Sequence, residues 1–222
     1  MKSGYPAGIY AERFGNANFA QRPCLFLDRD GVLVEETHYL HSVDDVRFII
    51  GVAEAVAQAN ASSIPVVMVT NQAGIGRGLY GWDDFHAVQR HIEQYYRVFG
   101  ARFDMVLSCA YHPDGMGSYA VANHPWRKPR PGMLKEAEQL LQVDLGQSLI
   151  IGDTLADLFA GESAGLRAGA LVMTGHGKRE WSEKGEEAFA KLISAGTLTP
   201  GRWDNAADAI IDWLDGPSSS QN

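Results

Sequence analysis

Asp28 and Asp30 stand one residue apart after a short apolar run, and Gly31 follows them directly. Side chains alternate along an extended backbone, so this spacing is expected to place both carboxyl groups on one side of the chain. Two carboxylates held this close repel each other unless a cation lies between them, which indicates a site for a hard divalent metal ion. One Asp-x-Asp alone also occurs in ordinary acidic turns.

Two further positions add groups that suit a phosphate. Thr70, followed by Asn71 and Gln72, ends a second apolar run, and a hydroxyl beside turn amides can hold phosphate oxygens. Lys128 stands just before Pro129 and a helix-like segment, where a fixed ammonium could neutralise an anion. Taken singly, Thr70 could instead be a helix or turn cap, and Lys128 a solvated surface residue.

Another pair of aspartates, Asp153 and Asp157, follows a later apolar run. Asp153 is predicted to be a third carboxylate for the metal. Asp157, one helical turn further on, could orient Asp153 or a metal-bound water. Either residue alone could also be a plain helix N-cap.

Apolar periodicity predicts the strands and helices that carry these groups. Buried strands are expected at 24–27, 64–69, 105–107, 148–151 and 170–173. Helices are expected at 52–59, 85–99, 133–141, 155–164, 178–192 and 205–214, the last capped by Asp204. Alternating strands and helices predict an α/β fold with a doubly wound, Rossmann-like parallel sheet. Such sheets bind ligands at the carboxyl ends of their strands, where all of these groups fall.

The chain is expected to form a single domain with short additions at both ends. About 60 residues separate Thr70 from Lys128, and they already contain one predicted helix and one strand, so no separate cap domain fits there. Specificity is therefore expected to come from the loops 35–42 and 108–126. The predicted divisions are an N-terminal extension at 1–22, the domain at 23–215 and a flexible tail at 216–222.

Composition excludes several classes of function. The formal net charge of −8 and the lack of a basic cluster argue against a nucleic-acid partner, although local cations could still bind a small anionic substrate. The two cysteines provide no disulfide framework, which favours the reducing cytoplasm. No apolar run reaches membrane-spanning length, so no membrane partner is expected. We expect a monomer or a weak oligomer.

In their order along the chain, these motifs resemble the four motifs of the haloacid-dehalogenase-like phosphatases. The longer blocks at 26–31, 69–78 and 127–134 resemble the branch that contains heptose 1,7-bisphosphate and histidinol-phosphate phosphatases. The resemblance covers roughly 23–174. The residues that carry it are Asp28-Arg29-Asp30-Gly31, Thr70-Asn71, Arg127-Lys128-Pro129 and Gly152-Asp153 followed by Asp157.

The resemblance implies a role for each motif. Asp28 would be the nucleophile that forms an aspartyl-phosphate, and Asp30 the general acid and then the general base. Asp28, Asp153 and the backbone carbonyl of Asp30 would hold Mg²⁺. Thr70 and Lys128 would stabilise the phosphoryl oxygens.

For the substrate, the resemblance implies a small phosphorylated molecule. Asn71 and Gln72 would line its binding site, and the planar guanidinium of Arg127 would recognise a second anionic group. D-glycero-D-manno-heptose 1,7-bisphosphate is the substrate we expect. Histidinol phosphate is the alternative substrate, and a non-catalytic phosphate-binding protein on the same fold is the alternative function.

One loop departs from the branch, whose members usually carry a zinc site ahead of the Arg-Lys-Pro motif. This chain keeps Cys109, but Tyr111, His124 and Trp126 stand where the other ligands are expected, and His112 is displaced by one residue. A zinc site needs correctly spaced ligands, so zinc is not expected. Cys109, His112 and His124 could still gather a metal, or aromatic packing could hold the loop.

Overall fold

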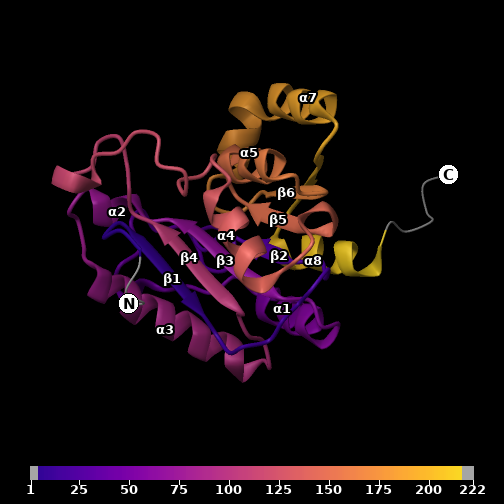
Figure 1. Cartoon of the computed structure of the whole chain (residues 1–222), viewed down its shortest axis with the longest axis horizontal. Helices are drawn as coiled ribbons and strands as arrows, with labels where there is room; N and C mark the ends of the chain where they lie inside the picture. Colours follow the sequence, from indigo (N-terminus) through magenta and orange to yellow (C-terminus); the bar gives the residue numbers. More distant parts are fainter. Residues whose placement is uncertain (1–4, 217–222) are drawn as a thin grey trace.

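In the computed structural model, which describes residues 5–216, a seven-stranded sheet runs through the molecule in the order β1-β4-β3-β2-β5-β6-β7 (Figure 1). All neighbouring strands are parallel except β1, which pairs antiparallel with β4. The expected mostly parallel α/β sheet is therefore confirmed. The strands are β1 (Ile9–Arg13), β2 (Leu25–Leu27), β3 (Val66–Asn71), β4 (Met105–Cys109), β5 (Leu149–Gly152), β6 (Ala168–Val172) and β7 (Thr199–Trp203).

Helices pack on both faces of this sheet, as the doubly wound fold requires. One hydrophobic cluster joins one face of the sheet to α1, α3 and α8, and a second cluster joins the other face to α4, α5 and α7. The longer helices are α1 (Val52–Ala61), α3 (Trp82–Val98), α4 (Gly132–Leu141), α5 (Leu155–Ala164), α7 (Glu186–Ala195) and α8 (Ala206–Asp215). The short helices are α2 (Ala73–Gly76) and α6 (Gly177–Glu180).

Strand β2 lies between β3 and β5 in the middle of the sheet, and all of its side chains are fully buried. The next strand along the chain, β3, lies on one side of β2, whereas β5 lies on the other. The strand order therefore reverses at β2, which is where open α/β sheets form their ligand crevice. Asp28 follows β2 directly and so stands at this crevice.

The N-terminal segment contains a strand that periodicity does not predict. Residues Ile9–Arg13 pair with β4 along the edge of the sheet, so the segment expected to be an extension instead contributes an edge strand. The backbone carbonyl of Gly8 also accepts a hydrogen bond from the amide of Ala110. Ile9 and Tyr10 are the two buried residues of this strand, so its side chains form neither an extended apolar run nor a clean alternation.

The C-terminal third differs from the sequence prediction in detail. The helix expected over 178–192 consists of α6, a π-helical turn at Trp181–Gly185 and α7. The predicted cap Asp204 is wrong, because the side chain of Asn205 accepts from the amide of Asp208 at the start of α8. Residues 217–222, most of the predicted tail, lie outside the described residues. Within 5–216, no helix combines the length and apolar character that crossing a bilayer requires.

Candidate active site

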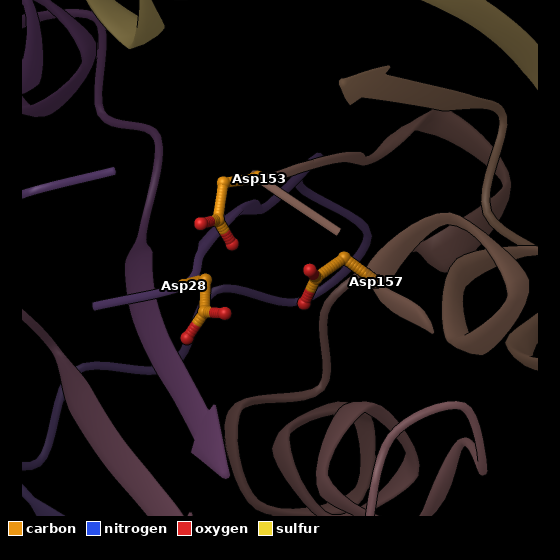
Figure 2. Close-up of side chains that lie close together, drawn as sticks. All are labelled: Asp28, Asp153 and Asp157. Carbon is orange, nitrogen blue, oxygen red and sulfur yellow. The ribbon is translucent and has the colours of Figure 1, made fainter. Parts of the chain in front are cut away.

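Three aspartates, at the ends of two strands and in the helix that follows the second, meet at the carboxyl edge of the central strands. Asp28 follows β2, Asp153 follows β5, and Asp157 lies in the first turn of α5. Each offers a carboxylate oxygen, and these oxygens lie within 4.8 Å of one another. Figure 2 shows the three carboxyl groups directed toward a common space. The two strand ends that the sequence predicted to converge thus do so.

A single buried ammonium group faces this cluster. The Nζ atom of Lys128 lies 2.8 Å from Asp28 Oδ2 and 2.5 Å from Asp157 Oδ1, and it donates to the Val69 carbonyl at 2.8 Å. Lys128 is only 4% exposed, so the surface alternative for this lysine is wrong. Asn71 fixes its backbone, because the Asn71 amide donates to the Lys128 carbonyl and accepts from the Lys128 amide, both at 3.1 Å.

The electrostatics of the cluster show an excess of negative charge. Burial raises the pKa of Asp28, and although Lys128 opposes this shift, Asp157 adds to it. Burial also raises the pKa of Asp153, with further increases from Asp28 and Asp157. Burial alone would lower the pKa of Lys128, but its ion pairs with Asp157 and Asp28 raise it, so the ammonium stays charged. One ammonium does not balance three carboxylates.

The residues present fit a hard divalent cation. Asp28 and Asp153 are oxygen donors, and burial together with the neighbouring carboxylates raises the pKa of both, so a cation bound between them would favour their charged forms. Asp157 is fully buried, its Oδ2 accepts from the hydroxyl of Thr154 at 2.6 Å and its Oδ1 faces Lys128, whereas Asp28, which also contacts Lys128, keeps part of its side chain exposed at the crevice. Asp28 and Asp153 are therefore the two carboxylates best able to hold Mg²⁺, and Asp157 anchors the lysine.

Gly31 allows the turn after β2 to approach Asp153. Its φ is +75°, in the left-handed region that favours glycine, and a Cβ at this position would lie 2.3 Å from Asp153 Oδ2. Asp153 is held from another direction by the backbone amide of His176, which donates to Oδ2 at 2.7 Å. The turn and the loop after β6 thus enclose this carboxylate.

Asp30 does not share the cation cluster with Asp28, contrary to the expectation from their spacing. Strand β2 ends at Leu27, so the alternation of an extended chain does not continue to Asp30. Its carboxylate instead pairs with Arg29, whose NH2 atom lies 2.9 Å from Oδ2. It also accepts from Gln72 Nε2 at 3.1 Å, and the same nitrogen donates to the Thr70 hydroxyl at 2.8 Å. Asp30, Thr70 and Gln72 therefore form a second group of site residues.

Arg127 is a half-buried cation near the same edge. Its NH1 atom donates to the Tyr111 carbonyl at 3.1 Å. Burial lowers the pKa of its guanidinium, and the positive charge of Arg77 lowers it further. Within residues 5–216, no carboxylate lies within ion-pair distance of Arg127. Its charge is therefore free to bind an anion from outside the protein.

In the loop 108–126, the residues that could have bound zinc do not converge on a common point. Cys109 Sγ lies 3.9 Å from His124 Nδ1, while the ring of His112 is engaged by the Asp114 amide and by Arg77. In the described part of the chain, the cluster of Asp28, Asp153 and Asp157 is the one group suited to a metal.

Aromatic packing instead stabilises this loop. The rings of Tyr111 and His124 stack with centroids 4.2 Å apart. Trp126 packs edge-to-face on Tyr5 at 5.3 Å, which ties the loop to the N-terminal segment. Gly8 lets the N-terminal segment lie close to Tyr111, because a Cβ at this position would lie 2.6 Å from the Tyr111 ring.

We therefore predict that the purified protein carries far less than one zinc ion per chain. Tyr111 and Trp126 stand where ligands would be needed, and His112 faces Arg77 rather than Cys109. Elemental analysis after extensive dialysis measures this, with His112→Asn as a matched variant whose zinc content should equal that of the wild type. One zinc per chain, released only on unfolding, would contradict the prediction and mean that Cys109 and His124 have recruited other ligands.

Two residues of the site were missed in the sequence analysis. Arg29 is 1% exposed and pairs with Asp30, and the hydroxyl of Tyr80 donates to Gln72 Oε1 at 2.6 Å. A signal for Arg29 exists, because an arginine between two aspartates after a buried strand enters the core and needs a carboxylate partner there. Tyr80 has no such signal, since its contact depends on the tertiary fold.

Comparison with known proteins gives similarities along most of the chain. The model of a family described as HAD-hydrolase-like matches residues 125–195. A D-glycero-beta-D-manno-heptose-1,7-bisphosphate 7-phosphatase from Mesorhizobium japonicum is 48% identical over 166 residues, covering 74% of this chain and 76% of the relative. A D-glycero-alpha-D-manno-heptose-1,7-bisphosphate 7-phosphatase from Burkholderia mallei is 40% identical, covering 67% of this chain and 78% of the relative.

A solved structure is also similar in fold. The D,D-heptose 1,7-bisphosphate phosphatase from B. bronchiseptica, complexed with magnesium and phosphate, superposes with a TM-score of 0.71. It is 27% identical in sequence, and the match covers 87% of this chain and 98% of that one.

Proposed function

Because this chain belongs to the haloacid-dehalogenase-like phosphatases, we propose that it is a magnesium-dependent phosphatase of a small sugar phosphate, D-glycero-D-manno-heptose 1,7-bisphosphate. The observation that carries the proposal is the buried cluster of Asp28, Asp153 and Asp157 around the ammonium of Lys128. Such a cluster accepts a divalent cation and, through it, a phosphate. The names of the relatives supply the sugar.

In the first half of the reaction, a carboxylate oxygen of Asp28 attacks the phosphorus atom. The bond between phosphorus and the sugar oxygen breaks, and an aspartyl-phosphate forms on Asp28. Asp30 donates a proton to the departing sugar oxygen. In the second half, Asp30 takes a proton from water, the water oxygen attacks phosphorus, and inorganic phosphate leaves with Asp28 restored.

The surrounding residues manage the negative charge. Asp28, Asp153 and the backbone carbonyl of Asp30 would hold Mg²⁺, which would supply the positive charge that a carboxylate needs to approach a phosphate anion. Lys128 points its ammonium at Asp28, and the buried Thr70 hydroxyl lies on the neighbouring strand end, so both suit the phosphoryl oxygens. Asn71 and Gln72, expected to touch substrate, support Lys128 and Asp30 through their side chains.

Arg127 supports the choice of a bisphosphate. Its half-buried guanidinium has a carbonyl partner in Tyr111 and a second arginine, Arg77, nearby. Arg77 already pairs with Asp114 at 3.0 Å, so the guanidinium of Arg127, next to Lys128 in the chain, is the cation that favours an anionic group beyond the reacting phosphate. A histidinol substrate would bring an ammonium group to this region instead, which the cations disfavour.

Activity against a panel of phosphate esters tests the proposed function. We expect the highest kcat/KM for heptose 1,7-bisphosphate, loss of turnover with EDTA, and recovery with Mg²⁺ alone. If histidinol phosphate is turned over best, the protein is a phosphatase with histidinol phosphate as its substrate. Phosphate binding without turnover of any ester would make the chain a non-catalytic binding protein. Cytoplasmic location and a monomeric or weakly oligomeric state stay predictions.

The Asp30→Asn variant tests the proton-transfer role. We expect kcat/KM for a sugar phosphate to fall about a hundredfold, because its leaving oxygen needs a proton. An aryl phosphate such as p-nitrophenyl phosphate leaves as a stable anion and should lose much less. Steady-state kinetics on both esters make the comparison. Equal losses on the two substrates would rule out Asp30 as the acid.

The Arg127→Ala variant tests recognition of the second phosphate. Use of heptose 1,7-bisphosphate should weaken by about 2–4 kcal/mol, the range for removing one partner of a partly buried charge pair. A small monophosphate should be hydrolysed nearly as well as by the wild type. Arg130→Ala is a matched control, since Arg130 lies in the same loop and bonds the Asn123 carbonyl. An equal effect of Arg127→Ala on both substrates would remove the recognition role.

A further inference from the structure

Arg29 is a buried charge whose carboxylate partner is its own chain neighbour. Its Nε atom donates to both Asp30 oxygens at 3.1 Å, and its NH2 atom donates to Oδ2 at 2.9 Å. Neighbouring side chains in a strand point apart, so this pairing requires the turn that follows β2. That turn is tight, because the Arg29 carbonyl accepts from the amides of Leu33 at 2.9 Å and Val34 at 3.2 Å. Backbone and side chain of Arg29 are thus both fixed.

Gln72, which lies between β3 and α2, holds the same carboxylate. Its Nε2 atom donates to Asp30 Oδ2, and its Oε1 atom accepts from the Tyr80 hydroxyl at 2.6 Å. Burial raises the pKa of Tyr80 to about 12, although Arg29 opposes the shift, so the phenol stays protonated and acts as the donor. The Tyr80 bond therefore sets which end of the Gln72 amide faces Asp30. The reversed amide would direct a carbonyl at a carboxylate.

Packing alone does not account for Arg29. The residue is 1% exposed, and its guanidinium lies 5.6 Å from the centre of the Phe85 ring. Its NH1 atom is buried without a hydrogen-bond partner among the described residues. An apolar side chain of similar volume would fill this space without burying a charge or an unpaired N–H group. Within residues 5–216, Asp30 is the one carboxylate that forms an ion pair with Arg29.

We propose that Arg29 and Gln72 are positioning residues that clamp the Asp30 carboxylate in one orientation for proton transfer. The inference rests on the proposed role of Asp30 as general acid and base. Proton transfer demands hydrogen-bond distance and alignment, so a carboxylate that rotates freely transfers its proton less often. The Arg29 side chain acts through the Asp30 carboxylate, whereas Gln72 also donates to the Thr70 hydroxyl, so Arg29→Met is the more selective of the two changes. Loss of the Arg29 side chain should therefore affect mainly the substrates that need the proton.

The test compares Arg29→Met, Arg29→Lys, Gln72→Met, Asp30→Asn and the double variant Arg29→Met/Asp30→Asn. For each, kcat/KM is measured on a sugar phosphate and on p-nitrophenyl phosphate. The ratio of the two values does not depend on how much of the protein is folded, because both substrates report on the same active molecules. Gln89→Met is the matched control, since Gln89 is also buried but bonds Glu93 on α3.

The ratio is kcat/KM on the sugar phosphate divided by kcat/KM on p-nitrophenyl phosphate. We expect Arg29→Met to lower this ratio about ten- to hundredfold and Gln72→Met to lower it several-fold. Arg29→Lys should have a ratio between those of Arg29→Met and the wild type. Gln89→Met should leave the ratio unchanged. In the Asp30→Asn background, Arg29→Met should change the ratio little, because the group it positions is already lost. If the Arg29 variants do not fold, the ratio measured for Gln72→Met tests the clamp.

Equal losses on the two substrates for Arg29→Met or Gln72→Met, with the ratio unchanged, would overturn the clamp and leave a structural role. Unchanged activity on both substrates would overturn it as well. If Asp30→Asn shows the selective loss but Arg29→Met and Gln72→Met do not, the clamp is refuted and the proposed role of Asp30 stands. A missing selective loss in Asp30→Asn itself refutes the proposed role of Asp30 and the clamp with it.

Discussion

The Asp28→Asn variant is expected to lose more than about a thousandfold of its kcat/KM while keeping its fold. An amide nitrogen or oxygen is a poor nucleophile toward phosphorus, and an amide is a weaker ligand for magnesium than a carboxylate. Two contributions to the same step therefore fail together. Steady-state kinetics on the sugar phosphate measure the loss. The loss should be similar for all phosphate esters, in contrast to the selective defect expected for Asp30→Asn.

The structure indicates that this substitution should be tolerated by the fold. Oδ1 of Asp28 accepts from the Arg29 amide at 2.7 Å, and an asparagine oxygen can accept the same bond. The asparagine loses the ion pair with Lys128, but this lysine keeps its ion pair with Asp157 and its bond to the Val69 carbonyl. Circular dichroism and thermal unfolding check this. Asp45→Asn, at an exposed position in the turn Val43–Asp45, is the control and should retain full activity. Activity of Asp28→Asn near that of the wild type would end the assignment of Asp28 as nucleophile.

The central architecture could be predicted because its strands are short apolar runs buried on both faces. Leu25–Leu27 and Leu149–Gly152 have little polar character to bond elsewhere, and parallel strands side by side bring their carboxyl ends to one edge. The convergence of Asp28 with Asp153 follows from that topology alone. The burial of Lys128 could not be predicted from periodicity, since it depends on the carboxylates of Asp28 and Asp157 that pair with its ammonium group.

The edge strands could not be predicted in this way. The strand Thr199–Trp203 contains Pro200 and Gly201, both poor strand residues, and it forms because β6 offers a free edge. The antiparallel strand Ile9–Arg13 likewise depends on the edge of β4. Periodicity describes how a segment is buried by its own side chains and carries no information about backbone pairing across the sheet.

The orientation of Asp30 was also beyond the sequence. Its spacing from Asp28 predicts a shared cation only if the strand continues, and it stops at Leu27. The turn then directs the carboxylate to Arg29, a contact between chain neighbours that strand geometry forbids. The same spacing is compatible with both arrangements, so only the tertiary structure separates the two aspartates into different groups.

Replacing Lys128 by methionine should lower the free energy of unfolding of the metal-free protein by about 3–5 kcal/mol, the cost of leaving buried carboxylates without their partner. Nζ of Lys128 contacts both Asp28 and Asp157, and the three clustered carboxylates have no other ammonium within reach in the described structure. For a chain of this size the melting temperature should fall by about 6–20 °C. Thermal and urea unfolding in EDTA measure the change.

Mg²⁺ and a second substitution identify the cause of this loss. Magnesium should restore part of the stability, because a cation bound to the folded state stabilises it by mass action and supplies the missing charge. Lys128→Met/Asp157→Asn should be more stable than Lys128→Met alone, since one unpaired carboxylate is removed with the lysine. Lys135→Met is the control: this lysine is half-exposed, pairs with Glu138 at 3.1 Å, and should change stability by less than about 0.5 kcal/mol. If Lys128→Met in EDTA is as stable as the wild type, or if the added Asp157→Asn lowers its stability further, unbalanced charge does not govern the site, and Lys128 contributes mainly as a packed side chain.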